Sequence, residues 1–483
     1  MSATAPTPVA AVGGPGRPVR IAALTAALLA ACVAFQLNAS MLSPVLVTMS
    51  HELNTDEATI GLSQTLFFTI AALFSLFLPR LSDIVGRKRV LLGMLVVMFV
   101  GSVVAALAMN VGMLFAGRLI QGVTGPVVPI CLLMLRAEIT DPRKYGAAMG
   151  LLTAVNGGIA GIDAIAGGWL ATTFGFRSVF WTIAVITVIA VAMVVFWGAE
   201  SRPSAGVRMD WWGVLPLVVS IGALLTGLNE AGRLASANWL LVALSLAVAV
   251  IAFAIFWRVE NRVAQPLVPT PLLKRRATWA LLTTTLLTMT GVFAVVNGLV
   301  TSLAQNADAG FGMAPDLASL AFLTPYAIVG WIVGPLAGRL APVLGYRRIL
   351  RIGLVGTIVA TVVMAFVGVH SLPVLIATTV VIGIGYAGIG NIMLNGLGIV
   401  LSPAENPGFL PGLNAGAFNL GAGLSFALLP ALQVATSAAP SSTTGYSAGM
   451  MLGAAITAGA LAVSFLIPRP ASAEVVTEAA DAR

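Results

Sequence analysis

Long apolar stretches recur along the whole chain, and they constrain its fold more than any other feature. A stretch of about 20 apolar residues, bounded by charged or turn residues, is long enough to cross a bilayer as a helix. Because these stretches are continuous and do not alternate with period two, they exclude a membrane β-barrel. We predict fourteen transmembrane helices, at residues 22–46, 58–79, 90–109, 112–135, 146–171, 178–198, 212–229, 238–257, 278–303, 317–340, 350–369, 373–400, 408–432 and 445–467.

The scarcity of charge agrees with this prediction. The 483 residues include 25 Lys or Arg and 17 Asp or Glu, where a soluble protein of this length carries roughly 120 charged residues. The mean hydropathy is +1.01, which excludes a soluble enzyme. Cys32 and Cys131 lie inside apolar stretches and predict neither a disulfide nor a metal site. The sequence contains no phosphate-binding loop motif, so we expect no cofactor, no metal and no ATP hydrolysis.

The basic residues gather on one predicted side of the membrane. Arg118 lies inside a predicted span, Arg177 and Arg233 fall in loops of one side, and the other 22 of the 25 fall in loops or tails of the opposite side. Lys and Arg accumulate in cytoplasmic loops, so we expect both termini to be cytoplasmic. The basic excess thus reports topology and does not indicate nucleic-acid binding.

A repeat relates the two ends of the chain. Residues 79–91 align without gaps on residues 338–350, with five of thirteen positions identical, and each segment follows the second helix of its half. Parallel repeats are common in transporters, which bind substrate between the halves. We therefore predict five regions: a disordered cytoplasmic tail at 1–20, an N-terminal six-helix bundle at 21–198, a linker with two inserted transmembrane helices at 199–276, a C-terminal six-helix bundle at 277–467, and a cytoplasmic tail at 468–483.

Three segments carry a resemblance to a known family. The run from Arg80 to Arg89, RLSDIVGRKR, resembles the loop signature of the major facilitator superfamily, and FAGRLIQG at 115–122 resembles its fourth-helix motif. The insertion that begins with DWWG at 210–213 and leads to Glu260 resembles the fourteen-helix drug:proton antiporter branch. The resemblance implies an all-α membrane protein with two six-helix bundles, two inserted helices and transport by alternating access. The chain departs from the antiporter pattern in the fifth helix, where the Gly-Pro pair is missing and Asp163 stands nearby.

Asp163 is the one acidic residue inside the predicted spans, and a charge at that depth costs about 2.5 to 3.5 kcal/mol on insertion scales. Arg118 and Asp163 lie on either side of the predicted hairpin at residues 140–142, at equal distances from it along the chain. Because helices rise by the same amount per residue, both side chains should lie at matching depth in the membrane. The two residues are candidate partners. The pair either joins two helices as a static ion pair or couples proton movement to conformational change.

A loop cluster is a candidate conformational gate, formed by Asp83, Gly86, Arg87, Lys88 and Arg89. Gly86 predicts a tight turn, and the basic residues anchor the loop on the cytoplasmic side. The resemblance adds a gating role, in which Asp83 pairs with nearby arginines or a helix N-terminus and stabilises one conformation.

Polar residues inside the spans are candidates for substrate binding, because a polar group in a membrane needs a partner. Each such group bonds either to another helix or to the substrate. In the family the first and fourth helices of each bundle line the cavity. The candidate substrate-binding residues are Gln36, Asn38, Arg118, Asn156, Asn297, Asn391 and Asn395. Aromatic residues are spread over many spans, and no stacking cage for a cation is evident.

These features predict a secondary active transporter and not an enzyme, because the spans contain one acid and no histidine for catalysis. Efflux of a small amphipathic compound or drug against protons follows from the fourteen-helix resemblance. The alternative is proton symport of a small metabolite, which the missing Gly-Pro pair and the amide-rich spans favour. We expect a monomer in a bacterial cell membrane, with the substrate, protons and lipid as partners.

Overall fold

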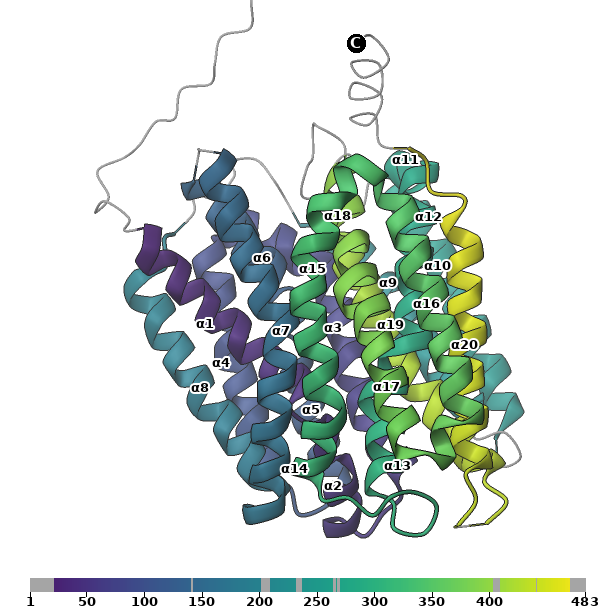
Figure 1. The fold of residues 1–483 in the computed structure, drawn as a ribbon. Coiled ribbons are helices and arrows are strands. Elements are labelled where there is room, and N and C mark those ends of the chain that lie inside the picture. The colour runs from purple at the N-terminus through teal and green to yellow at the C-terminus, as the bar shows by residue number, and fades with distance from the viewer. Residues whose placement is uncertain are drawn as a thin grey trace, which may run out of the picture.

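The structure, a computed structural model, describes residues 21–139, 142–200, 209–231, 237–263, 266, 270–402, 409–439 and 441–469. In these residues the chain forms helices and no strand, and most of the helices run along one common axis (Figure 1). A helix satisfies its backbone hydrogen bonds internally, which a lipid environment requires. An all-α membrane fold is therefore confirmed.

The N-terminal helices comprise α1 (Ile21–Ser40), η1 (Ser43–Val45), α2 (Leu46–Glu52), α3 (Glu57–Val85), α4 (Arg87–Ala106), α5 (Val111–Gly122), α6 (Val127–Glu138), α7 (Pro142–Phe174) and α8 (Phe176–Trp197). Between them and the C-terminal helices lie α9 (Trp211–Ala231), α10 (Trp239–Glu260) and α11 (Thr270–Leu273).

The C-terminal helices comprise α12 (Arg276–Ala294), η3 (Val295–Val300), α13 (Thr301–Gln305), α14 (Pro315–Ala318), η4 (Ser319–Leu323), α15 (Thr324–Leu344), α16 (Tyr346–Phe366), η5 (Gly368–His370), α17 (Leu372–Ile382), η6 (Gly383–Gly390), α18 (Asn391–Val400), α19 (Phe409–Thr436) and α20 (Thr444–Ser464). Of these, η3, η4 and η6 are π-helical segments inside longer helices.

The expected number of fourteen membrane spans is not confirmed. Among the described residues, twelve helices are long and apolar enough to cross a membrane. Helix α9 contains a shorter apolar stretch, Trp211–Leu224. Helix α7 lies at the fifth predicted span, but many of its side chains, including that of Asn156, lie outside the described part of the chain.

The repeated loops share one backbone feature. Gly86 separates α3 from α4 with a φ of 114°, and Gly345 separates α15 from α16 with a φ of 88°. Residues other than glycine rarely adopt a positive φ, because their Cβ atom clashes with the backbone. The two glycines occupy aligned positions of the sequence repeat, so the repeat extends to the geometry of the turn.

Two pairs of long helices make the most extensive contacts between the N-terminal helices and the C-terminal ones. Helix α3 packs along α19, and α7 packs along α15. Small residues allow these approaches: a Cβ atom built on Gly161 of α7 would lie 2.8 Å from the Cβ of Ala327 in α15. Helices α9 and α10 pack on each other, and α9 also contacts α3 and α19. The two inserted helices therefore pack mainly on each other and lie beside the contact between α3 and α19.

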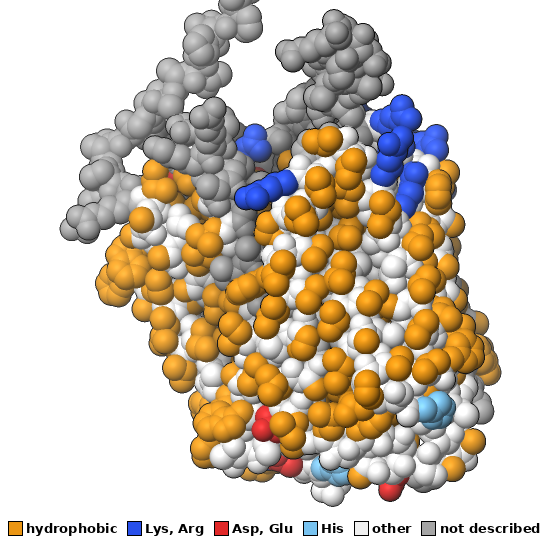
Figure 2. Space-filling model, viewed as in Figure 1, with side chains coloured by type: hydrophobic (Ala, Val, Ile, Leu, Met, Phe, Trp, Pro, Cys, Tyr) orange, Lys and Arg blue, Asp and Glu red, His pale blue; other side chains and the backbone are white. Residues whose placement is uncertain are grey.

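Charged side chains appear mainly at the two ends of the molecule, seen from the side shown in Figure 2. Lys and Arg gather at the end where α1 begins and α20 ends, which we call the basic end, and Asp, Glu and His appear at the opposite end, near α2, α13 and α14 (Figures 1 and 2). Orange apolar side chains cover the visible face between them (Figure 2). Large apolar side chains such as Ile332, Val250 and Phe366 are 70%, 70% and 64% exposed, which suits a surface in contact with lipid.

Candidate functional site

Arg118 of α5 is completely buried and is held by amide oxygens. Its Nη1 donates hydrogen bonds to Oδ1 of Asn38 at 2.7 Å and to Oε1 of Gln121 at 2.8 Å. Its Nη2 donates to Oε1 of Gln64, and the guanidinium carbon lies 4.2 Å from the ring centroid of Phe67. These contacts tie α1, α3 and α5 together around one buried cation.

Asp163 of α7 is also buried, with 2% of its surface exposed. Its Oδ2 accepts a hydrogen bond of 2.5 Å from Oγ of Ser40 in α1, and its Oδ1 accepts one of 2.9 Å from the N–H of Ala164. Nε2 of Gln36 lies 3.2 Å from the same Oγ of Ser40 and donates to it. The predicted proton-coupling carboxylate thus ends a short polar chain that begins at Gln36.

Arg118 and Asp163 are the candidate partners, and the structure places each of them against α1. In the described part of the chain, no ion pair joins them, and each bonds to α1 instead, Arg118 to Asn38 and Asp163 to Ser40. Asn38 and Ser40 are two residues apart on α1, and side chains at this spacing on an α-helix point in directions that differ by about 200°. Both residues therefore reach the same segment of α1, as their matching depth predicts, but they bond to different sides of that helix.

The candidate gate forms a compact cluster at the basic end. Asp83 and Arg87 form an ion pair with a Nη2–Oδ1 distance of 2.9 Å, and Nη1 of Arg87 donates to the carbonyl of Leu133 in α6 at 2.8 Å. Beyond Gly86, the N–H of Lys88 donates to Oε1 of Glu200 at 3.2 Å, and Arg89 pairs with the same carboxylate at 3.7 Å. The cluster thus joins the α3–α4 turn to α6 and to the residues after α8.

The remaining candidate amides lie in the C-terminal helices. Asn297 lies in η3 and accepts a hydrogen bond of 3.3 Å from Oγ of Ser43 in η1. Asn391 and Asn395 share one face of α18, where Nδ2 of Asn395 donates to Oδ1 of Asn391 at 2.9 Å. Asn297 is buried, whereas Asn391 and Asn395 are partly exposed, so these two remain open to further partners.

Three phenylalanines from both halves of the chain meet in one cluster that the sequence analysis missed. Phe68 of α3 lies 5.2 Å from Phe293 of α12 and 6.4 Å from Phe426 of α19, between ring centroids. Phe293 and Phe426 lie 5.9 Å apart, edge to face. A phenylalanine in an apolar span carries no sequence signal of its own, because the contact depends on three helices distant in the chain.

Gln64 and Ser40 were also missed, although Gln64 carried a signal. It is an amide inside a predicted span, and the rule that selected Gln36 and Asn38 selects it too. Ser40 carries no comparable signal, because serine hydroxyls in helices commonly bond to their own backbone.

The opposite end is closed by hydrogen bonds between the two halves. Besides the contact of Ser43 with Asn297, Nε2 of Gln305 in α13 donates to the carbonyl of Pro44 in η1 at 3.1 Å. In addition, Oγ of Ser302 donates to the carboxylate of Glu57 at the start of α3. Glu57 is a further residue that the sequence analysis did not select.

Comparisons with known proteins agree with this architecture. Residues 28–426 match the family model described as Major Facilitator Superfamily. A uridine/deoxyuridine transporter of Lactococcus lactis subsp. cremoris (strain MG1363) is 50% identical over 455 residues, which cover 93% of this chain and 95% of that protein. The quinolone resistance protein NorB of Staphylococcus aureus (strain bovine RF122 / ET3-1) is 25% identical over 451 residues, covering 90% and 92%.

A solved structure shows the same fold. The human organic anion transporter MFSD10 (TETRAN) superposes with a TM-score of 0.63 at 13% sequence identity, and the match covers 93% of this chain and 100% of that chain. The chain is therefore a multi-pass membrane transporter and not an enzyme, and it belongs to the major facilitator superfamily.

Proposed function

We propose that this chain imports a pyrimidine nucleoside, uridine or deoxyuridine, together with protons. The observation that carries the proposal is the likeness to the uridine/deoxyuridine transporter, which extends over nearly the whole length of both chains. Efflux of drugs, the first expectation from the sequence, is the weaker candidate, because the relatives named for drug resistance are 25% identical. The motifs behind that expectation position helices and loops and do not select a substrate.

The polar residues near α1 suit an uncharged polar substrate. Arg118 already donates to three amide oxygens, and Asp163 already accepts from Ser40. A charged ligand would have to displace those partners, whereas a neutral one would not. Uridine is neutral, and its uracil edge offers a donor between two acceptors, which a side-chain amide can match.

Partly exposed amides and one aromatic ring provide the contacts that we assign to the nucleoside. Gln36 of α1 and the pair Asn391 and Asn395 of α18 are partly exposed, and we assign to them hydrogen bonds with uracil and the ribose hydroxyls. Phe293 is partly exposed as well, beside the buried Phe68. We assign to Phe293 the stacking contact with the base, because the face of a nucleobase stacks well on an aromatic ring.

The transport cycle that we propose uses the two joins between the halves. The N-terminal bundle at 21–198 and the C-terminal bundle at 277–467 rock about α3–α19 and α7–α15. Asp163 carries the proton, and the cluster of Asp83 and Arg87 holds the α3–α4 turn against α6 and so stabilises one conformation of the N-terminal bundle.

For the topology, we propose fourteen spans, in which α7 and α9 are added to the twelve long apolar helices. Residues 199–276 are then the linker that carries the two inserted helices. The basic end would face the cytoplasm of a bacterial cell, because Lys and Arg gather there. This orientation places both termini in the cytoplasm. We expect the monomer to be the transporting unit.

The test is flux in liposomes that contain the purified protein. Labelled uridine added outside should accumulate when the outside is acidic, and uridine addition without a gradient should make the external medium more alkaline. Acidification of that medium would indicate antiport instead. Uptake of a quinolone but not of uridine would contradict the proposed substrate.

A further inference from the structure

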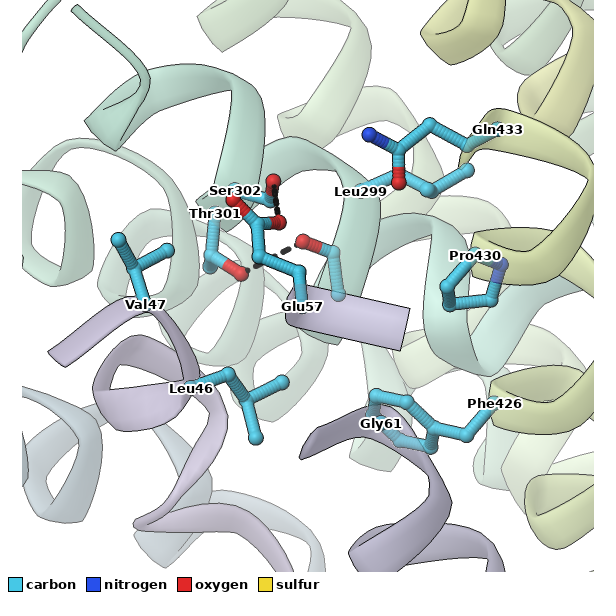
Figure 3. A pocket seen from close by; sticks show the side chains of 11 residues that line it. Leu46, Val47, Glu57, Gly61, Leu299, Thr301, Ser302, Phe426, Pro430 and Gln433 are labelled. Atoms are coloured by element: carbon cyan, nitrogen blue, oxygen red, sulfur yellow. Dashed lines mark hydrogen bonds between the residues drawn. The ribbon is translucent and has the colours of Figure 1, made fainter. Parts of the chain in front are cut away.

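Glu57 ends a chain of hydrogen bonds that crosses between the two halves of the protein. Oγ of Ser302 in α13 donates to its carboxylate, and the same Oγ lies 2.8 Å from Oη of Tyr446 in α20 (Figure 3 shows the first of these contacts). Nδ2 of Asn306 donates to Oη of Tyr446 at 3.3 Å. A hydroxyl has one proton to donate, so the chain runs from Asn306 through Tyr446 and Ser302 to Glu57.

The carboxyl group of Glu57 borders a small pocket that is mainly apolar. Residues from both halves line it, and no Lys or Arg is among the described ones: Leu46, Val47, Glu57, Gly61, Gly298, Leu299, Thr301, Ser302, Phe426, Pro430 and Gln433 (Figure 3). Burial in this pocket raises the pKa of Glu57 above its ordinary value, and it outweighs the opposing effect of the hydrogen bond from Ser302. The closed interface therefore makes the carboxylate form of Glu57 less stable than it is in water.

The neighbouring titratable groups are few. His51 of α2 favours the charged form of Glu57 and lowers its pKa, whereas the adjacent Asp56 has the opposite effect. Tyr446 is the titratable group of α20 that faces Glu57. The described pocket residues from η3, α13 and α19 are uncharged. No ion pair with Glu57 is found among the described residues, so its charge has no cationic partner there.

We propose that Glu57 is a proton-binding site that controls closure of the opposite end of the protein. When the halves separate there, water solvates the carboxylate and it ionises readily. When they close, the group borders the apolar pocket, where the charged form is less stable than it is in water. Closure therefore takes up a proton, and opening releases it.

The sign of the pH dependence follows from this linkage. The closed state binds the proton more tightly than the open state, so low pH favours the closed state and high pH favours the open one. For one proton, the ratio of closed to open molecules falls by up to about tenfold per pH unit between the two pKa values. This device is separate from Asp163 and does not depend on which substrate the protein carries.

The test measures the separation of the two halves at that end. Met109, between α4 and α5, is 86% exposed, and Ala438, after α19, is also exposed. Spin labels on Met109→Cys and Ala438→Cys, in protein reconstituted in nanodiscs without substrate, report the distance between the halves by electron paramagnetic resonance. We expect the short-distance fraction of the otherwise unchanged protein to fall as the pH rises from 5 to 9.

Three variants decide the proposal. Glu57→Gln should stay closed across this pH range, whereas Asp308→Asn, which neutralises an exposed carboxylate at the same end, should respond like the unchanged protein. His51→Gln should keep the pH response, with its midpoint shifted to higher pH. An unchanged pH response in Glu57→Gln, or loss of the response in His51→Gln, would overturn the proposal.

If Glu57→Gln does not fold, Glu57→Asp replaces it, and an unchanged midpoint in that variant would count against the proposal. Since no substrate is present, these outcomes are independent of nucleoside import.

Discussion

The hydroxyl of Ser40 in α1 lies 2.5 Å from the carboxylate of Asp163 in α7 and donates a hydrogen bond to it. Helices α1 and α7 pack against each other in the N-terminal half, and α7 also contacts α15 in the C-terminal half. Protonation of Asp163 would weaken the bond from Ser40, since a neutral carboxyl is a poorer acceptor than a carboxylate. A change at this one contact can therefore alter how α7 sits between the two halves.

Asp163→Asn should abolish uptake driven by the proton gradient and leave exchange of substrate across the membrane intact. The amide keeps the size of the side chain and a hydrogen bond with Ser40 but cannot bind or release a proton. Parallel measurements of gradient-driven uptake and of uridine exchange in liposomes check this. Asp308→Asn is the matched control, because its carboxylate is exposed at the surface. Gradient-driven uptake that survives in Asp163→Asn would rule out its coupling role.

Arg118→Leu should destabilise the protein. It leaves the oxygens of Asn38, Gln64 and Gln121 without their donor in a buried site, and each unsatisfied group costs about 1 to 3 kcal/mol. Thermal unfolding in detergent should show a clear drop in Tm. Arg339→Leu, at an exposed position of α15, should leave Tm nearly unchanged. Equal Tm values for the two variants would mean that the buried contacts contribute little.

Phe293→Leu should raise the KM for uridine if this ring stacks on the base. Stacking of a base on an aromatic ring contributes about 1 to 3 kcal/mol, which corresponds to a rise of roughly 5-fold to 150-fold. Initial uptake rates over a range of uridine concentrations measure KM. Phe366→Leu, on the exposed face of α16, is the control. A KM equal in both variants would place the base elsewhere.

Gly168→Val should prevent the opposite end from closing. A Cβ atom at Gly168 of α7 would lie 2.7 Å from the carbonyl oxygen of Pro315 and 2.8 Å from the Cα of Asp316 in α14. These are backbone atoms, so the halves must separate to make room. We expect uptake to fall more than tenfold and the distance between labels at 109 and 438 to lengthen.

Gly222→Val serves as the control for that variant, because nothing lies within 4 Å of a Cβ atom built there in α9. It should transport uridine normally. If Gly168→Val also transports normally, the contact between α7 and α14 is not needed for closure.

Much of the fold could be predicted from the sequence, because membrane helices are specified by length and hydropathy. The repeat could be predicted as well, and the positive φ values of Gly86 and Gly345 show why glycine stands in both loops. The number of spans is harder to predict, because the apolar stretch of α9, Trp211–Leu224, is shorter than the length that usually crosses a membrane.

The candidate site could be predicted only in part. Hydropathy identifies Arg118 and Asp163 as unusual and places them at similar depth, but it contains no information about rotation around a helix axis. Packing sets that rotation, and it directs the two side chains to Asn38 and Ser40. The meeting of Phe68, Phe293 and Phe426 depends in the same way on contacts between distant segments.

The π-helical segments give the two halves different mechanical properties. Among the described residues, η3, η4 and η6 interrupt three long helices of the C-terminal half, whereas the N-terminal half has a short 3-10 turn at η1. The wider turns of a π-segment break the regular ladder of backbone hydrogen bonds, and a helix bends most easily there. The C-terminal half thus contains several points at which its helices can bend. The change between the two open states of the transporter can therefore combine bending of the C-terminal bundle with rigid rotation of the N-terminal bundle.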